Sequence, residues 1–130
     1  MDRKSEIREL LRLSPEAVAT RSGRHLVVCP DIDALHRRFA EDIAAELRQR
    51  QDAGLPTRLI LPVGPVAQYP ILADLIAQER ISLRDTWLFF MDEYCDDAGR
   101  ALPPEHPLSF RGVAQRLLLD RLPATAGLCP

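Results

Sequence analysis

The chain has 130 residues, of which 46% are hydrophobic and 28% charged, and its formal net charge is -2. This composition predicts one domain with a hydrophobic core, and the small negative charge excludes the basic field that recruits nucleic acid or an anionic membrane. No stretch approaches the roughly 20 apolar residues of a membrane span. Three cysteines without metal-type spacing, and no signal pattern, predict a reduced, cytoplasmic setting.

The first 23 residues carry the pattern of a helical segment. Ile7, Leu10 and Leu11 recur at helical spacing between residues 5 and 13. Ser14, followed by proline and glutamate, is typical of the N-cap of a second helix, and Gly23 is placed to end that helix. We therefore expect residues 1–23 to form an N-terminal helical segment.

From residue 24 onward, apolar runs typical of strands alternate with helical patterns. The clearest helical pattern runs from Ile32 to Leu47, and Gly54 and Pro56 end it. Such alternation predicts an α/β domain with a parallel sheet and right-handed crossovers. The predicted strands are His25–Cys29, Arg58–Val63 and Trp87–Met91, and the helices that follow them span residues 32–47, 71–80 and 107–122.

The number of predicted strands is low for this class of fold. A doubly wound domain usually carries about five or six strands, whereas the pattern above contains three. Residues 123–130 follow the last helix and are predicted to be coil. We expect residues 1–130 to form a single domain that is an incomplete, truncated copy of a longer α/β fold.

The strand Trp87–Met91 ends in two adjacent carboxylates, Asp92 and Glu93. Its continuous apolar run predicts burial on both faces of a parallel sheet, and ligands of open α/β sheets bind at the carboxyl ends of the strands. Neighbouring strand residues point to opposite faces, so only one of the two acids can address a given pocket. The pattern favours a single carboxylate base over a pair of acids that share a proton or a metal. That the two acids merely begin a solvated loop stays open.

Three further places carry candidate binding residues. Gly64 follows a strand and precedes a helix, where backbone amides approach anions, although a plain turn is the simpler interpretation. His106 and Ser109 lie where the polar loop meets the last helix, and Ser109 or its neighbours could cap that helix or bind an anion. Asp96–Asp97 could hold magnesium, but a solvated acidic loop is the better interpretation, and no metal site is predicted.

Three motifs together resemble a known family. In order and spacing they are similar to the amino-terminal half of the glucosamine-6-phosphate deaminase/isomerase family, which is related to the 6-phosphogluconolactonases, and the likeness covers residues 24–122. The resemblance implies a Rossmann-like parallel sheet flanked by helices, with a sugar phosphate bound over its strand ends. The motifs are Leu61-Pro62-Val63-Gly64, Met91-Asp92-Glu93-Tyr94 and Glu105-His106-Pro107-Leu108-Ser109-Phe110.

The resemblance also implies roles for single residues. Asp92 would move a proton between C2 and C1 of the ring-opened amino sugar before ammonia leaves, without a metal or organic cofactor. The substrate would be bound by Gly64, Glu93, His106 and Ser109. The loop after Leu61-Pro62 is shorter than in the family and has no hydroxyl, and the later Gly-Asn-Asp-Gly-His cluster and the basic phosphate clamps are absent. We therefore expect this chain to lack full activity.

Other functions compete with this one. A lactonase acting on a phosphogluconolactone shares the scaffold, and a non-catalytic fragment or binding module would keep the fold without the chemistry. A signalling receiver domain needs a lysine at a late strand end, and the single lysine, Lys4, precedes the first strand, which excludes that class. The expected partner is a small sugar phosphate, and a homo-oligomer stays open.

Overall fold

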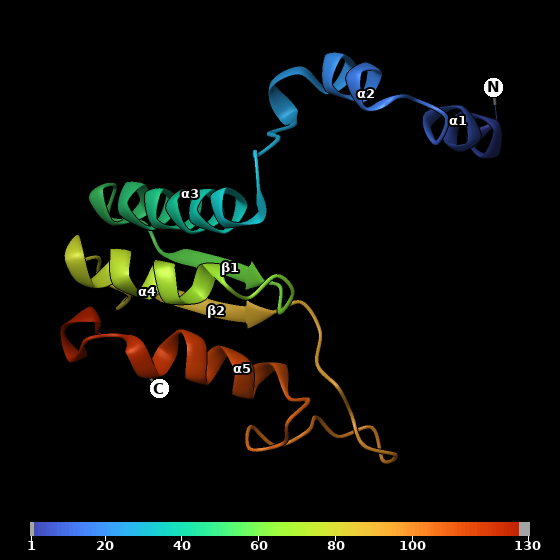
Figure 1. Cartoon of the computed structure of the whole chain (residues 1–130). Helices are drawn as coiled ribbons and strands as arrows, with labels where there is room; N and C mark the ends of the chain where they lie inside the picture. The colour runs from blue at the N-terminus through green and yellow to red at the C-terminus, as the bar shows by residue number, and fades with distance from the viewer. Residues whose placement is uncertain (1, 128–130) are drawn as a thin grey trace. The chain divides into compact units, whose positions relative to one another are not determined.

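A computed structural model describes residues 2–127, and contacts within it divide the chain into two units, residues 1–30 and 31–130. The first unit holds two short helices, α1 (Arg3–Leu10) and α2 (Pro15–Ser22) (Figure 1). The amide of Ala17 donates to Ser14 Oγ at 3.2 Å, which confirms Ser14 as an N-cap. Neither helix buries a residue.

The predicted strand His25–Cys29 is wrong. Gly23–His25 forms a turn of 3₁₀ helix, and residues 26–29 form no strand. Val27 and Val28 are 56% and 75% exposed. A short apolar run becomes a strand only where it gains a partner strand and a surface to pack on, and this one pairs with no strand among residues 2–127.

The second unit alternates helices and strands. Its strands lie side by side and parallel, with Thr57 opposite Thr86 and Leu61 opposite Phe90, and a helix connects them (Figure 1). This confirms an α/β fold with a parallel sheet flanked by helices, at the level of the two strands described. In chain order the elements are α3 (Ile32–Asp52), β1 (Thr57–Leu61), α4 (Gln68–Gln78), β2 (Thr86–Phe90) and α5 (Phe110–Leu117).

Helix α3 forms where the periodic pattern predicts it. Asp31 Oδ1 accepts a hydrogen bond from the Ala34 amide at 2.7 Å and caps the helix. The residues that α3 buries are three and four positions apart, and α3 packs against α4. They are Ala40, Ile43, Ala44 and Leu47.

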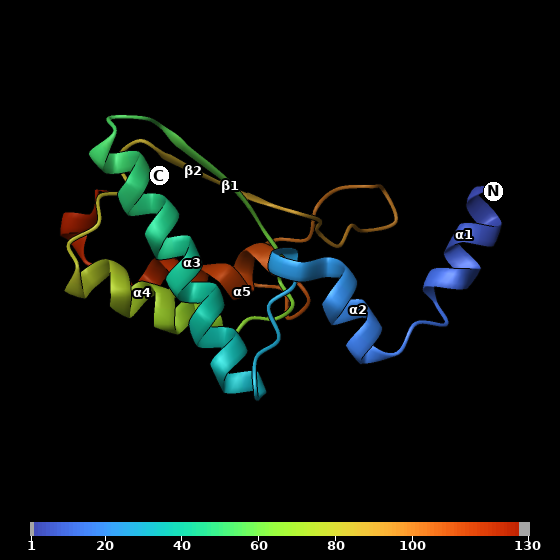
Figure 2. The same cartoon turned by 90° about the horizontal axis from the view of Figure 1, so that it is seen from above.

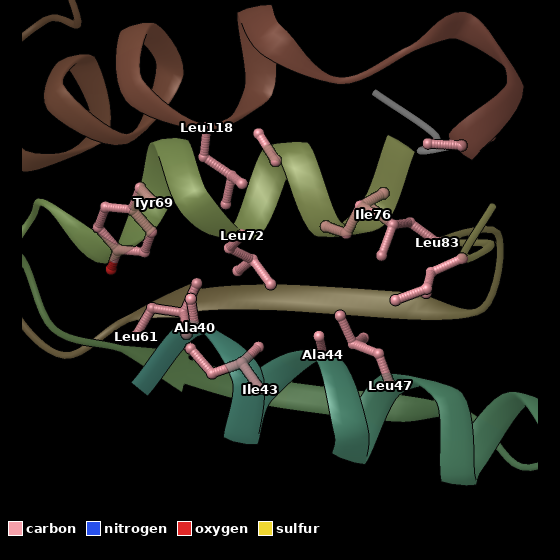
Figure 3. Packing of buried hydrophobic residues seen from close by; sticks show 13 residues of the cluster. Ala40, Ile43, Ala44, Leu47, Leu61, Tyr69, Leu72, Ile76, Leu83 and Leu118 are labelled. Carbon is pink, nitrogen blue, oxygen red and sulfur yellow. The ribbon is translucent and has the colours of Figure 1, made fainter. Parts of the chain in front are cut away.

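The core lies between α3, α4 and the strands. Tyr69, Leu72 and Ile76 lie on the side of α4 that faces the strands and α3, and Leu118 points from the end of α5 toward α4 (Figure 3). All four are at most 2% exposed. Their burial fixes the two strands against the helices.

Within residues 31–127, helices cover one face of the sheet. Figure 2 shows α3, α4 and α5 on the same side of β1 and β2. Ile60, Trp87 and Phe89 on the other face are 67%, 48% and 50% exposed, whereas Leu88 and Phe90 are partly buried. The prediction that β2 is buried on both faces is therefore wrong, because no element within residues 31–127 covers the second face.

The last helix is shorter than predicted, since α5 begins at Phe110 and ends at Leu117. Turns of 3₁₀ helix follow at Leu119–Arg121 and Ala124–Ala126, within the predicted helix and the predicted coil respectively. The end of that coil, residues 128–130, lies outside the described residues. None of the helices in residues 2–127 has both the length and the apolar character that a membrane crossing needs.

Candidate functional site

The carboxyl ends of β1 and β2 meet at one edge of the sheet. Leu61 pairs with Phe90, and the amide of Met91 donates to the Leu61 carbonyl at 3.1 Å. The loop that carries Gly64 and the segment that carries Asp92 therefore leave neighbouring strands at the same edge. Open α/β sheets bind their ligands at this position.

Asp92 is exposed, and within residues 2–127 no hydrogen bond or ion pair engages its carboxylate. Its oxygens are free to accept a proton. A base that carries a proton between two carbons also needs restricted access of water, and the side chain does not have this protection. A cavity of about 450 Å³ lies between β2 and α5, but Asp92 is not among its lining residues.

Glu93 is engaged in a different way. Its Oε1 accepts hydrogen bonds from the amides of Tyr94 and Phe110 at 2.9 and 2.8 Å. Its Oε2 accepts from the Ser109 hydroxyl at 3.1 Å and from the Arg111 amide at 2.9 Å. The carboxylate thus ties the end of β2 to the first turn of α5, where unpaired amides favour a negative charge.

These contacts set the protonation of Glu93. Burial raises the pKa of its carboxyl, but the hydrogen bonds from Arg111, Phe110, Tyr94 and Ser109 together outweigh burial and hold the pKa below its ordinary value. Glu93 is accordingly ionised near neutral pH and serves as a fixed acceptor.

Ser109 is fully buried and is the N-cap of α5. Its Oγ accepts from the Gly112 amide at 3.1 Å while its hydroxyl donates to Glu93. The prediction that a residue of this segment caps the last helix is confirmed. That Glu93 and Ser109 bind substrate stays a prediction, and the structure shows both already bound to each other.

The loop between β2 and α5 folds back on itself. The amide of Leu102 donates to the Tyr94 carbonyl at 2.8 Å. The main chains of Cys95 and Ala101 pair as a single antiparallel β-bridge. The rings of Tyr94 and Phe110 meet edge to face with centroids 5.1 Å apart. The loop is therefore closed at its base by main-chain and aromatic contacts.

Asp96 closes the tip of this loop. Its carboxylate pairs with the Arg100 guanidinium at 2.8 Å and accepts from the amides of Ala98 and Arg100, each at 2.9 Å. The Arg100 amide and then its side chain hold the pKa of Asp96 below the ordinary value. These contacts favour a structural role, and among residues 2–127 no group of three or more acidic, histidine or cysteine side chains is placed to hold a metal ion.

His106 is half-buried, and its Nδ1 lies 3.2 Å from the Leu108 amide that donates to it. Its own amide donates to the Pro103 carbonyl at 2.9 Å. His106 therefore stabilises the turn that leads into α5. Its predicted contact with substrate stays a prediction.

Gly64 is exposed in the turn between β1 and α4. This turn is a poor anion site, because Pro65 and Pro70 have no amide hydrogen and the Tyr69 amide already donates to the Val66 carbonyl at 3.1 Å. Helix α4 has no side-chain cap at Ala67, so its first amides gain no acceptor from a cap.

Two buried polar residues shape this turn and are not evident from the sequence. Gln68 is fully buried and its Nε2 donates to the Pro65 carbonyl at 2.7 Å, while the Tyr69 hydroxyl donates to the Pro62 carbonyl. Burial raises the pKa of Tyr69 to about 12. Gln68 Oε1 is buried without a partner among the described residues. In the sequence, Gln68 and Tyr69 form a pair of polar side chains at the start of α4, and this pair could have indicated their role.

Comparison with protein-family models, with curated proteins and with solved structures finds no match to this chain.

Proposed function

We propose that this chain belongs to the sugar-phosphate isomerases and deaminases, with Asp92 as the base that transfers a proton during aldose-ketose isomerisation and deamination of an amino-sugar phosphate. Residues 24–122 would then be the amino-terminal half of a Rossmann-like domain. The observation that supports this most is the contrast between two adjacent acids. Glu93 is held by four hydrogen bonds, whereas Asp92 is free at the carboxyl end of β2.

The proton transfer between C2 and C1 requires one carboxylate in the right position. Asp92 would remove the proton from C2 of the ring-opened sugar and return it to C1, which regenerates the carboxylate and leaves an imine at C2. Water then adds to C2 and ammonia leaves, so that the product is the 2-ketose phosphate. General acid-base catalysis of this kind contributes about 10²–10⁴ in rate. Because Asp92 is exposed, we expect turnover by the 130-residue chain to be far below that of a shielded site.

The test is the replacement Asp92→Asn, assayed with glucosamine 6-phosphate for released ammonia and, in deuterated water, for exchange of the C2 hydrogen by NMR. We expect both rates to fall by about 10²-fold or more. Asp97→Asn is the matched control, because Asp97 is an exposed acid of the following loop. Equal rates in the wild type and Asp92→Asn would rule out the proposed base.

A second candidate is a non-catalytic module that binds a sugar phosphate. The solvent exposure of Asp92 favours it, because a base without shielding from water supports little turnover. Here glucosamine 6-phosphate would raise the melting temperature without turnover, with a stabilisation of about 2.7 kcal/mol at one hundred times Kd. Glucosamine without phosphate is the control ligand, and 6-phosphogluconolactone hydrolysis tests the lactonase alternative.

A further inference from the structure

The main chain around Asp92 is held on both sides although the Asp92 side chain is free. On one side the Met91 amide donates to the Leu61 carbonyl at 3.1 Å, which anchors the chain to β1. On the other side Glu93 is anchored to α5 through its carboxylate. The direction in which Asp92 is presented therefore depends on its neighbours.

We propose that Glu93 is a positioning residue for Asp92. By binding the first turn of α5, Glu93 fixes the backbone at the end of β2 and with it the placement of the Asp92 carboxylate at the edge of the sheet. This inference rests on the proposed role of Asp92 as the base.

The acceptor capacity of Glu93 supports a positioning role over substrate binding. An ionised carboxylate offers about four lone-pair sites, and four protein donors occupy them, two on each oxygen. The donors come from both ends of the loop, since Tyr94 begins it and Ser109, Phe110 and Arg111 follow it. A substrate hydroxyl would have to displace one of them.

The geometry transmits this constraint to Asp92. Glu93 Oε1 accepts from the Tyr94 amide as well as from Phe110, so the peptide after Glu93 is tied to the same point as its side chain. Peptide planarity leaves two soft dihedrals per residue. Asp92 therefore lies between two anchored peptides and has little freedom of its own.

A close approach between α5 and the segment before it holds the same loop. A Cβ added to Gly112 would lie 2.0 Å from the Pro104 carbonyl oxygen, so only glycine allows α5 to pack against the loop here. Gly112→Ala would push the loop away from α5 without altering the Glu93 side chain itself, although the Gly112 amide is bonded to Ser109, which donates to Glu93. It is an independent way to loosen the contact between loop and helix.

The experiment measures backbone motion in the full 130-residue chain by ¹⁵N relaxation, with hydrogen exchange at the Phe110 and Arg111 amides. In Glu93→Ala we expect the Asp92 order parameter to fall from about 0.85 to below about 0.6 and the two amides to exchange about tenfold faster. Glu93→Gln keeps the size and one acceptor oxygen, so we expect values in between. Gly112→Ala should also lower the Asp92 order parameter.

Asp31→Ala is the matched control, because it removes the N-cap of α3 and leaves Glu93 in place. An unchanged Asp92 order parameter in Glu93→Ala would overturn the proposal, as would an equal fall in Asp31→Ala. The C2-hydrogen exchange assay separates the two hypotheses. A lower kcat with an unchanged KM in Glu93→Gln supports a positioning role for Glu93. If Asp92→Asn has no effect on exchange, Asp92 is not the base. The relaxation data then still show whether Glu93 restrains the backbone at Asp92.

Discussion

Asp92 and Glu93 are neighbours in the chain but differ in what surrounds them. The four hydrogen bonds to Glu93 are stronger for the ionised carboxylate, and they lower its pKa despite burial. A group whose pKa is lower in the folded state stabilises the fold above its unfolded pKa, and this contribution is lost as the pH falls through the folded value. Glu93 should therefore make stability depend on pH in the acidic range.

We predict that Glu93→Gln lowers the free energy of unfolding by about 1–3 kcal/mol at pH 7. The difference from the wild type should shrink as the pH falls from above about 4.5, because protonated Glu93 loses the same interactions. Denaturant titrations of both proteins between pH 7 and pH 3 measure it. Subtracting the two curves removes the contributions of the other carboxyls, and a difference that stays constant with pH would contradict the prediction.

At the level of single residues the sequence predicts that a strand ends before Asp92, but it does not predict that Glu93 binds α5. The apolar run before Asp92 and the polar loop after it mark the end of a strand. That Glu93 binds α5 depends on contacts 16 to 18 residues away, which local patterns do not report. Gly112 offered a usable signal, since glycine within a helical pattern often marks a close approach.

The helices follow their periodic patterns where their packing partners are local. Helix α3 matches its apolar spacing, and α4 packs on it through residues with almost no exposed surface. The segment His25–Cys29 shows the opposite case, because its apolar residues have no partner strand among residues 2–127. An apolar run of this kind predicts a strand only where a partner strand is also present, whereas α1 and α2 form without burying a residue.

We predict that Leu72→Ala lowers the free energy of unfolding by about 2–5 kcal/mol, because Leu72 lies in the core between α4, α3 and the strands. Leu108→Ala removes the same atoms from a side chain that is 55% exposed and should cost far less. Thermal or urea unfolding monitored by circular dichroism gives both values. Equal losses in the two variants would show that this core does not hold the helices together.

On the scale of the whole molecule, one face of the sheet is apolar and uncovered within residues 31–127. The sequence could not predict this, since a continuous apolar strand is typical of a sheet covered on both sides. Exposed apolar patches of this kind bind hydrophobic dyes and promote association.

We predict that Phe89→Thr reduces dye binding and concentration-dependent light scattering and changes the free energy of unfolding by less than about 1 kcal/mol. Phe89 is 50% exposed, and threonine suits a strand. Leu108→Thr, at an exposed loop position, is the control. Dye binding that is the same in Phe89→Thr and in the wild type would show that this face is not the patch that attracts the dye.

The uncovered face also carries Trp87, the only tryptophan of the chain, with the Arg58 guanidinium 5.3 Å from the centre of its ring. Its indole is about half exposed, so its fluorescence emission is set by water and by this cation. Any molecule that came to cover β1 and β2 on that side would shift the emission to shorter wavelength and shield it from iodide or acrylamide quenching. The fluorescence of Trp87 therefore reports whether another molecule covers the exposed face of β1 and β2.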